Sequence, residues 1–462
     1  MQKILAITWL TWQAALRFRL FLVIAALLVL AVAGLPMVIK DDGTAQGFTQ
    51  IILTYTLSSI TALLGLSTLW LSCGTLARDV EECQIQVVAT KPIARWQIWL
   101  GKWLGIVVLN AVLLAISGGC VYGLLQWRAS KLPAREQVIL REQILVARGS
   151  ARPPNINAEI EAETERILQN RLKTTLVEKV DVPEVRRQIH EGVKADAQVV
   201  PPSYTKSWQI DLGAAKNYLK GRPLQLRIKF NASQKNASDT YLGHWQIGVP
   251  QKTLLWQSEV MSLAQDTFHE FSIPPDLFDA DGVLTVSFVN DNETIAMLFP
   301  MDDGIEVLYP EGGFALNYVR GLAVIFCWMA LLSALGLMAA SFLSFPVATF
   351  FALGLIIVGL SCGTLSESVE SGSVGAGNEE TGQAGHSMAD IVLIPVFKAI
   401  LGVAGFLKTS SPIDSLSTGR SITWLELGTV FGQIVGVTGG GIAVIGMLLF
   451  NRRELAAAQG TQ

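Results

Sequence analysis

Charged residues gather in one short stretch between two apolar runs, at 74–102. It contains the acidic pair Glu81 and Glu82, followed by Arg95. Carboxylates and a forked guanidinium can form charge-assisted hydrogen bonds across an interface. The stretch is therefore a candidate contact surface for a partner. The alternative is a solvated loop whose basic residues mark one side of a membrane.

The sequence offers no residues arranged for catalysis, nucleotide binding or metal binding. It has no GxxxxGK followed by Ser or Thr, no HExxH and no GxSxG. The segment ISGGC at 116–120 lies inside an apolar run, where a nucleotide cannot reach it. The four histidines show no metal-ligand spacing, and the net charge of −3 gives no footprint for nucleic acid. We expect no metal site, no nucleic-acid binding and no catalytic residue.

The composition indicates a membrane protein, because mean hydropathy is +0.43. About six apolar stretches approach the ~20 residues that cross a bilayer as a helix. They are roughly 20–39, 51–73, 103–125, 319–342, 345–362 and 425–450. The segment 391–407 is short and contains Pro395 and Lys398, so we expect a re-entrant or interfacial helix there. The first span lacks a small-residue cleavage site and is expected to be retained.

Basic residues orient these spans. Lys and Arg are present in the N-terminal tail, in loop 74–102 and in the C-terminal tail, whereas 363–390 carries only acidic charges. Short basic loops favour the cytoplasm, so six spans place both termini and loop 74–102 inside. The stretches 126–318 and 363–424 are then expected outside.

One motif occurs twice, as SCGTLARDVE at 72–81 and SCGTLSESVE at 361–370. The first copy is expected to end a span on the cytoplasmic side and the second on the outer side, which excludes a shared site on one face. Small residues suit the end of a tightly packed span. The repeat is either a coincidence in a sequence of biased amino-acid composition or the remnant of an inverted three-span repeat, as found in transporters.

The outer insertion between the third and fourth spans, 126–318, is too long for an ordinary loop. Its first part, 130–198, has apolar residues at helical spacing and predicts helices. From 204 to 317 the period changes to two, as in LQLRIKF at 224–230, which predicts short strands and a β-sandwich. The predicted fold is a polytopic α-helical membrane protein with a large α+β insertion, organised as 1–125, 126–318 and 319–462.

Aromatic residues of the insertion could stack on a sugar, although such residues more often belong to a core. They are Trp208, Tyr241, Trp245 and Trp256. The insertion could instead cover the exit of a pathway or dock an extracytoplasmic partner.

Glycines at a spacing of four predict close helix contact in two places. One is the pair Gly101 and Gly105 at the start of the third span. The other is the last span, with Gly428, Gly432, Gly436 and Gly440. This second set indicates either packing inside one subunit or a dimer seam.

Loop 74–102 resembles the cytoplasmic loop of ABC-2 type transporter permeases. That family has an acidic pair, then a Pro-x-x-Arg and a Gly-Lys that opens the third span. The matching residues are Glu81, Glu82, Lys91, Pro92, Arg95, Gly101 and Lys102, whereas Cys83 stands where the family often has Gly. The N-terminal KILAITWLTWQAALRFRLF and the C-terminal FNRREL resemble the family's first helix and closing motif. The nearest group includes the nitrous-oxide-reductase maturation and gliding-motility permeases.

The resemblance implies a transport subunit in a bacterial inner membrane, and not an enzyme. Such permeases dimerise, with an identical or a different second permease, and are driven by a separate ATPase that binds ATP and Mg²⁺. A loop helix at about 78–97 would pass the motion of the ATPase to the spans, with Glu81, Glu82 and Arg95 as its contacts. The expected function is an exporter permease. The alternative is a membrane-anchored scaffold or receptor whose outer domain binds a glycan or a protein.

Overall fold

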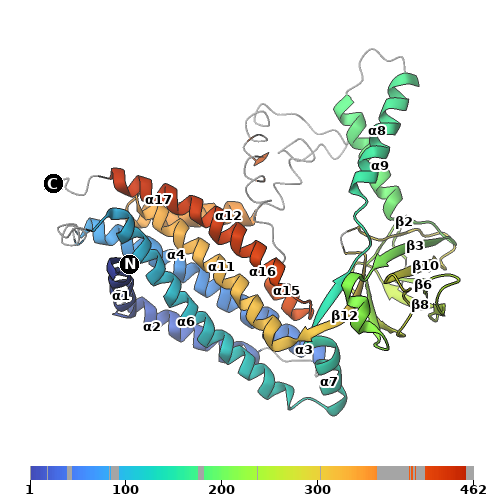
Figure 1. Cartoon of the computed structure of the whole chain (residues 1–462), viewed down its shortest axis with the longest axis horizontal. Coiled ribbons are helices and arrows are strands. Elements are labelled where there is room, and N and C mark those ends of the chain that lie inside the picture. Colours follow the sequence, from blue (N-terminus) through green and yellow to red (C-terminus); the bar gives the residue numbers. More distant parts are fainter. Residues whose placement is uncertain are drawn as a thin grey trace. The chain divides into compact units, whose positions relative to one another are not determined.

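The computed structural model of the chain consists of two compact units (Figure 1). One, here called the membrane unit, comprises residues 1–147 and 312–462, and the other, here called the β unit, comprises 148–311. The structure describes residues 2–17, 19–38, 44–82, 84, 93–174, 182–236, 238–301, 303–361, 395, 397–398, 401 and 411–453.

The membrane unit is built from helices, several with π-helical turns (η1, η2 and η4). In chain order they are α1 Gln2–Arg17, α2 Arg19–Val38, α3 Ala45–Thr49, η1 Gln50–Thr56, α4 Leu57–Glu81, α6 Arg95–Ala129, α7 Ala134–Ile139, η2 Leu140–Ile144, α11 Phe314–Ala340, α12 Phe345–Leu360, α15 Pro412–Ser417, α16 Trp424–Val430, η4 Phe431–Gly439 and α17 Gly440–Arg452.

Four helical stretches of the described chain are long and apolar enough to cross a membrane. They are Gly47–Glu81, Arg95–Ala129, Phe314–Ala340 and Trp424–Arg452. Two shorter apolar helices, Val23–Pro36 and Phe345–Gly359, fall where the first and fifth spans are expected. The chain is therefore a polytopic helical membrane protein with a β-containing insertion, and six spans stay a prediction. The expected re-entrant segment 391–407 and the second motif copy, 361–370, lie almost wholly outside the described residues.

Helices α4 and α11 cross at small residues. A Cβ atom on Gly336 of α11 would collide with the hydroxyl of Ser72 on α4. Beside it, Cys73 Sγ lies 3.6 Å from the Gly336 carbonyl oxygen. The first motif copy, 72–81, forms the end of α4, which stops at its last residue, Glu81, so the helix extends beyond the expected span 51–73. These residues also pack inside the bundle, where Ala77 is fully buried.

Helix α1 lies against α6 at the two glycines predicted to permit close contact. A Cβ on Gly101 would meet Ile7, and one on Gly105 would meet Thr11. Thr8 Oγ1 also donates to the Gly101 carbonyl oxygen at 3.2 Å. The other face of α1 exposes large apolar side chains, as in a helix lying at a membrane surface. These include Leu5, Trp9 and Leu10.

The β unit contains three sheets and a helical hairpin. Its strands are β1 Val146–Ala151, β2 Val199–Val200, β3 Thr205–Asp211, β4 Leu224–Ile228, β5 Asn231–Ala232, β6 Thr240–Ile247, β7 Trp256–Gln257, β8 Met261–Ala264, β9 His269–Ile273, β10 Val283–Asn290, β11 Met297–Leu298 and β12 Ile305–Gly313. Its helices are α8 Asn157–Thr174, α9 Val182–Gln198, η3 Gly213–Ala215 and α10 Lys216–Leu219. The sheets have the orders β1-β12-β4-β9, β3-β10-β6-β7 with β8 beside β6, and β2-β11-β5.

The two larger sheets share one apolar core. Leu226 of β4 and Val286 of β10 are fully buried in it, together with Trp245 and Tyr241 of β6. These two aromatic side chains therefore cannot stack on a sugar, which removes half of the predicted glycan-stacking set. Trp208 is partly buried against the same core, edge-on to Phe299 with ring centroids 5.3 Å apart.

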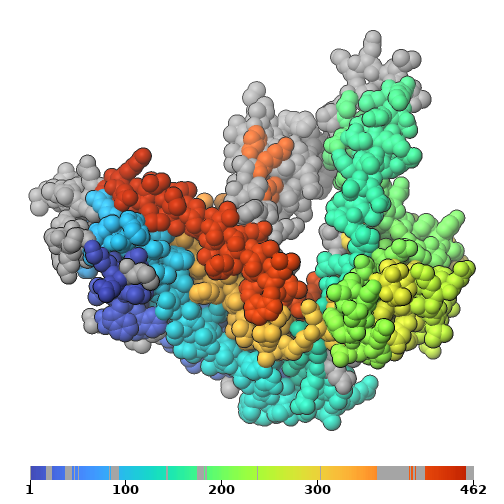
Figure 2. All heavy atoms as spheres, in the orientation of Figure 1, coloured from blue at the N-terminus to red at the C-terminus, as the bar shows by residue number. Residues whose placement is uncertain are grey.

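Helices α8 and α9 pair as a hairpin that stands out from the strands of its unit (Figure 2). Ile160, Leu168 and Ile189 are buried between them. The region expected to be wholly helical, 130–198, also contains β1, because residues there add an edge strand beside β12. The unit also begins later than expected, since η2 buries Leu140 in the core of the membrane unit.

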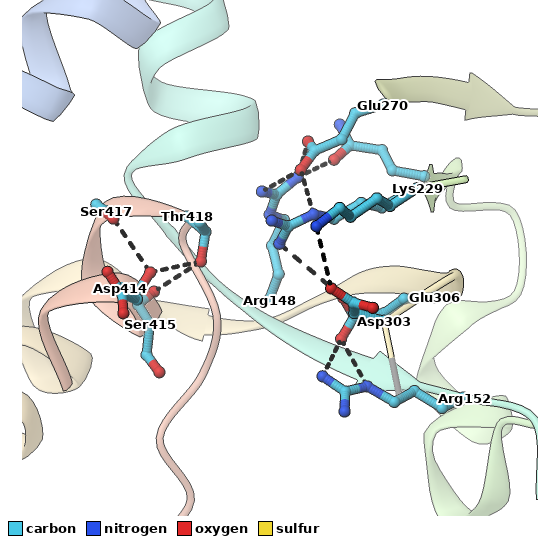
Figure 3. A network of polar contacts seen from close by, with 12 residues as sticks. Arg148, Arg152, Lys229, Glu270, Asp303, Glu306, Asp414, Ser415, Ser417 and Thr418 are labelled. Atoms are coloured by element: carbon cyan, nitrogen blue, oxygen red, sulfur yellow. Dashed lines mark hydrogen bonds and ion pairs between the residues drawn. The ribbon is translucent and has the colours of Figure 1, made fainter. Parts of the chain in front are cut away.

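An ion-pair network covers the far side of the β12-β4-β9 sheet (Figure 3). Strand register places Arg227 between Glu270 and Glu306, so opposite charges face one another across the strands. Arg148 Nη1 lies 2.9 Å from Glu270 Oε2, and Arg152 Nε lies 3.3 Å from Glu306 Oε1. The side chain of Glu306 is only 2% exposed. The face of β4 opposite the core is thus a polar layer in which Arg227 and Glu306 are buried.

We predict that Glu306→Gln destabilises the β unit. We expect a cost of about 1–3 kcal/mol, because the buried Arg227 loses one of its two carboxylate partners and keeps Glu270. Pulse proteolysis of the full chain in urea would measure the unfolding midpoint of residues 148–311. The control is Glu163→Gln, which removes an exposed pair with Arg166 and should change stability by less than about 1 kcal/mol. Equal midpoints for both variants would contradict a stabilising network.

Candidate coupling surface

The charged residues predicted to contact a partner lie where helix ends meet. Helix α4 ends at Glu81, α6 begins at Arg95 and α17 ends at Arg452, at the end of the membrane unit that also holds α1 (Figure 1). We call this the α4–α6 end. Lys91 and Pro92, also predicted to form the contact, lie outside the described residues.

Lys102 occupies an internal position at this end. Its side chain is 9% exposed, and its Nζ lies 2.5 Å from Asp79 Oδ2. The same ammonium donates to the Thr75 carbonyl oxygen at 2.8 Å. A buried ammonium needs such partners, because its desolvation is costly. Lys102 therefore ties the last turns of α4 to α6, and does not face outward toward a partner.

Arg95 caps the end of the last helix. Its Nη1 donates to the carbonyl oxygens of Phe450, Asn451 and Arg453, at 3.2, 2.8 and 2.8 Å. The last carbonyls of a helix have no partner inside it and carry partial negative charge. The guanidinium satisfies both needs, so the start of α6 is fixed to the end of α17.

Glu81 joins α4 to the start of α12. Its Oε1 accepts a hydrogen bond from the Phe345 backbone N–H at 2.9 Å, and a carboxylate suits the positive end of a helix. The guanidinium of Arg78 lies over the Phe345 ring at 4.4 Å. The end of α4 is thus attached to α12 by a hydrogen bond and a cation–π contact.

Arg453 performs the same task for α11, since its Nη1 donates to the Ala340 carbonyl oxygen at 3.0 Å. Burial lowers the pKa of this guanidinium, and the charge of Glu81 acts in the opposite direction.

Sequence reasoning missed the roles of Asp79 and Arg453. The sequence contains one signal for Asp79. It lies just before the acidic pair and, at helical spacing, on the same helix face as Thr75, which is buried.

The outward surface at this end includes Glu82, Gln84 and Trp96, all exposed. Gln84 Nε2 donates to Glu82 Oε2 at 2.6 Å. The predicted separate loop helix does not begin near Arg78. The backbone N–H of Glu82 still donates to the Arg78 carbonyl oxygen at 2.8 Å, so this turn continues α4.

The glycine stripe of the last span faces no other described helix of the chain. A Cβ added at Gly428 or Gly432 would meet nothing within 4 Å, and at Gly436 or Gly440 only the backbone of its own helix. By contrast, Gly446 packs against Met338 and Trp99. The helix therefore uses one face inside the bundle and leaves the stripe open.

Comparison with known proteins gives one match. Residues 5–130 match the family model described as ABC-2 family transporter protein. This confirms the predicted resemblance to ABC-2 type permeases, whereas the narrower group stays a prediction. No characterised protein and no solved structure matches the chain. Within the part of the chain that the structure describes, no three His, Cys, Asp or Glu side chains are grouped to hold a metal ion.

We predict that Lys102→Met and Asp79→Asn each destabilise the membrane unit and that the double variant recovers most of the loss. Each single change leaves one partner unmatched; because Asp79 is one-third exposed, we expect about 1–3 kcal/mol. Thermal unfolding of the purified chain in detergent measures the effect. Lys131→Met removes an exposed lysine elsewhere and is the control. Strictly additive losses would show that the two side chains are not coupled.

Proposed function

We propose that this chain, whose residues 5–130 match the ABC-2 transporter family, is the membrane-spanning subunit of an ABC transporter. The family match is the observation that carries the proposal, since it supports a transport permease that works with an ABC ATPase. The sequence has no GxxxxGK loop to cradle phosphates, so we assign ATP and Mg²⁺ to that separate chain.

The ATPase docks at the α4–α6 end in this proposal. Glu82, Gln84 and Trp96 offer an acidic, amide and aromatic surface there, and aromatic residues are favoured at protein interfaces. Lys91, Pro92 and the acidic pair belong to the contact by their resemblance to the family motif. Gly101 and Lys102 lie beneath this surface and hold it in position. Gly101 packs against α1, and Lys102 pairs with Asp79.

The attachments of this loop explain how motion of the ATPase reaches the spans. Arg95 binds the end of α17, and Glu81 binds the start of α12. A displacement of the loop therefore acts on α12 and α17 as well as on α4 and α6. Charged hydrogen bonds suit this task because they are directional and strong.

We further propose export across a bacterial inner membrane, with both termini in the cytoplasm. The basic residues at the α4–α6 end support this orientation, since short basic loops are retained inside. The resemblance to exporter permeases supports the direction. The scaffold alternative has less support, because Tyr241 and Trp245 lie in the core of the β unit.

We predict that a C-terminally tagged chain, extracted in mild detergent, copurifies a stoichiometric Walker-type ATPase. Glu82→Lys should weaken this association by about tenfold or more, equivalent to about 1.4 kcal/mol at an interface charge pair. The folded yield should not change, because Glu82 is exposed.

The control is Glu163→Lys in the β unit, which is partly exposed and should leave ATPase recovery unchanged. Absence of an ATPase under conditions that hold a known transporter together would overturn the proposed function. Full ATPase retention by Glu82→Lys would remove this residue from the contact.

We also propose that a second copy of the chain, or a related permease, covers the glycine stripe. Small residues let two helices approach until their backbones touch, which is the main source of helix association in a bilayer. The last span is the least buried of the four long apolar helices. No helix among the described residues contacts its glycine face, and a partner permease would supply this contact.

We predict that Gly436→Cys crosslinks two copies of the chain in native membranes under mild oxidation. The distance between paired cysteine Cα atoms must be about 4.4–6.8 Å, which only close helix approach provides. Leu355→Cys on α12 is an exposed apolar control and should stay monomeric on a non-reducing gel. Crosslinking of both variants to the same extent would indicate random collision and contradict the seam.

A further inference from the structure

An apolar cavity of about 220 Å³ lies inside the membrane unit, between helices α1, α2, α4 and α6. It is larger than an engineered core cavity of about 150 Å³ that stays dry and binds benzene. Its walls are mostly aliphatic and aromatic, with Leu109 and Leu113 from α6 and Trp70 and Leu71 from α4. The cavity can therefore hold part of an apolar molecule.

One polar side chain in the wall lacks a partner. Asn110 is 2% exposed, and its amide Nδ2 has no hydrogen-bond partner among the described residues. The wall hydroxyls differ, since Ser67 donates to the Leu64 carbonyl and Thr75 to the Ser72 carbonyl. An unpaired buried amide is destabilising because its donor has lost water, and the bilayer core has no water to supply an acceptor. A ligand with a hydrogen-bond acceptor would remove this cost.

The cavity is elongated and has a positive end. Ser67 and Arg78 both line it and are eleven residues apart on α4, which corresponds to about 16 Å along the helix. Arg78 lies near the α4–α6 end, whereas Asn110 lies eight residues beyond Lys102, about 12 Å deeper along α6. Trp70 in the wall is 44% exposed, so one side of the cavity reaches the lipid-facing surface.

We propose that this cavity binds a lipid-like anion with one long apolar chain. The chain lies along α4, its charged end is near Arg78, and a hydroxyl or carbonyl oxygen partway along it accepts from Asn110 Nδ2. Water alone fits less well, because a buried water needs two to four polar partners and most of this wall is apolar. The inference concerns this chain alone and does not depend on the ATPase.

The test uses the full chain in detergent, titrated with the fluorescent polyene fatty acid cis-parinaric acid. We expect saturable binding, and competition by 12-hydroxystearate at least about fivefold better than by stearate, a gain of about 1 kcal/mol for one hydrogen bond. Asn110→Leu keeps the branched shape and the number of side-chain heavy atoms and removes the donor. It should abolish the advantage of the hydroxyl while leaving stearate competition unchanged.

Cavity-filling variants test the location. Ser67→Phe from α4 and Ala15→Leu from α1, whose side chain is 2% exposed, should each weaken parinaric acid binding about tenfold or more. The two substitutions are on different helices, so the location can still be tested if one of the variants does not fold. Leu66→Phe is the matched control, because Leu66 is 57% exposed toward lipid beside Ser67 and does not line the cavity.

Mass spectrometry of material extracted from wild type and Ser67→Phe would show whether the natural occupant is a membrane phospholipid or a free fatty acid. Depletion of either class in the variant supports the proposal. Undiminished parinaric acid binding in both filling variants would overturn it. So would an Asn110→Leu variant that is more stable but retains the preference for the hydroxylated acid, since the cavity would then be only a packing defect.

Discussion

The close crossing of α4 and α11 at Ser72 and Gly336 is the contact on which the membrane unit depends. Lipid tails are as apolar as leucine, so helices in a bilayer gain little from burying apolar surface and must gain from close packing. Helix α11 also contacts α6, α12, η4 and α17, so its distance from α4 sets the positions of the other helices. The small residues of the first SCGTL motif, in the last turns of α4, satisfy this constraint.

Charged side chains then connect the helix ends. Each helix terminus leaves backbone groups without partners inside the helix. Arg95 satisfies the end of α17, Arg453 the end of α11 and Glu81 the start of α12. The same side chains make the loop between α4 and α6 mechanically continuous with the other spans. The residues that hold the helix bundle together at this end therefore also underlie the surface at which we propose that the ATPase docks.

The sequence predicts the features that depend on a local residue pattern. It misses those that depend on which residues of separate segments lie next to one another. Apolar runs predict the positions of the long spans, and the spacing of Gly101 and Gly105 predicts a close helix contact, which α6 makes with α1. The α4 end is missed because the helix continues past its apolar run, held by Asp79 and Lys102 from different segments.

In the β unit the alternation at 224–230 identifies the core face, where Leu224 and Leu226 are fully buried. The burial of Arg227 on the other face requires Glu270 and Glu306 to be its cross-strand neighbours, and strand pairing is not visible in one segment. The open glycine stripe and the cavity at Asn110 likewise depend on which helices are neighbours.

The cavity and the α4–α6 end share the last turns of one helix. Thr75 and Arg78 line the cavity, while Asp79 and Glu81, on the same turns, hold α6 and α12. An α-helix held by its own hydrogen bonds moves as a rigid element over such short lengths, so a ligand that displaces α4 also displaces these attachments. Linkage requires the converse: if the cavity fits its ligand better in one position of the loop, holding the loop there tightens binding by the same factor. Under that condition, α4 would couple occupancy of the proposed ligand cavity to the surface at which we place the ATPase.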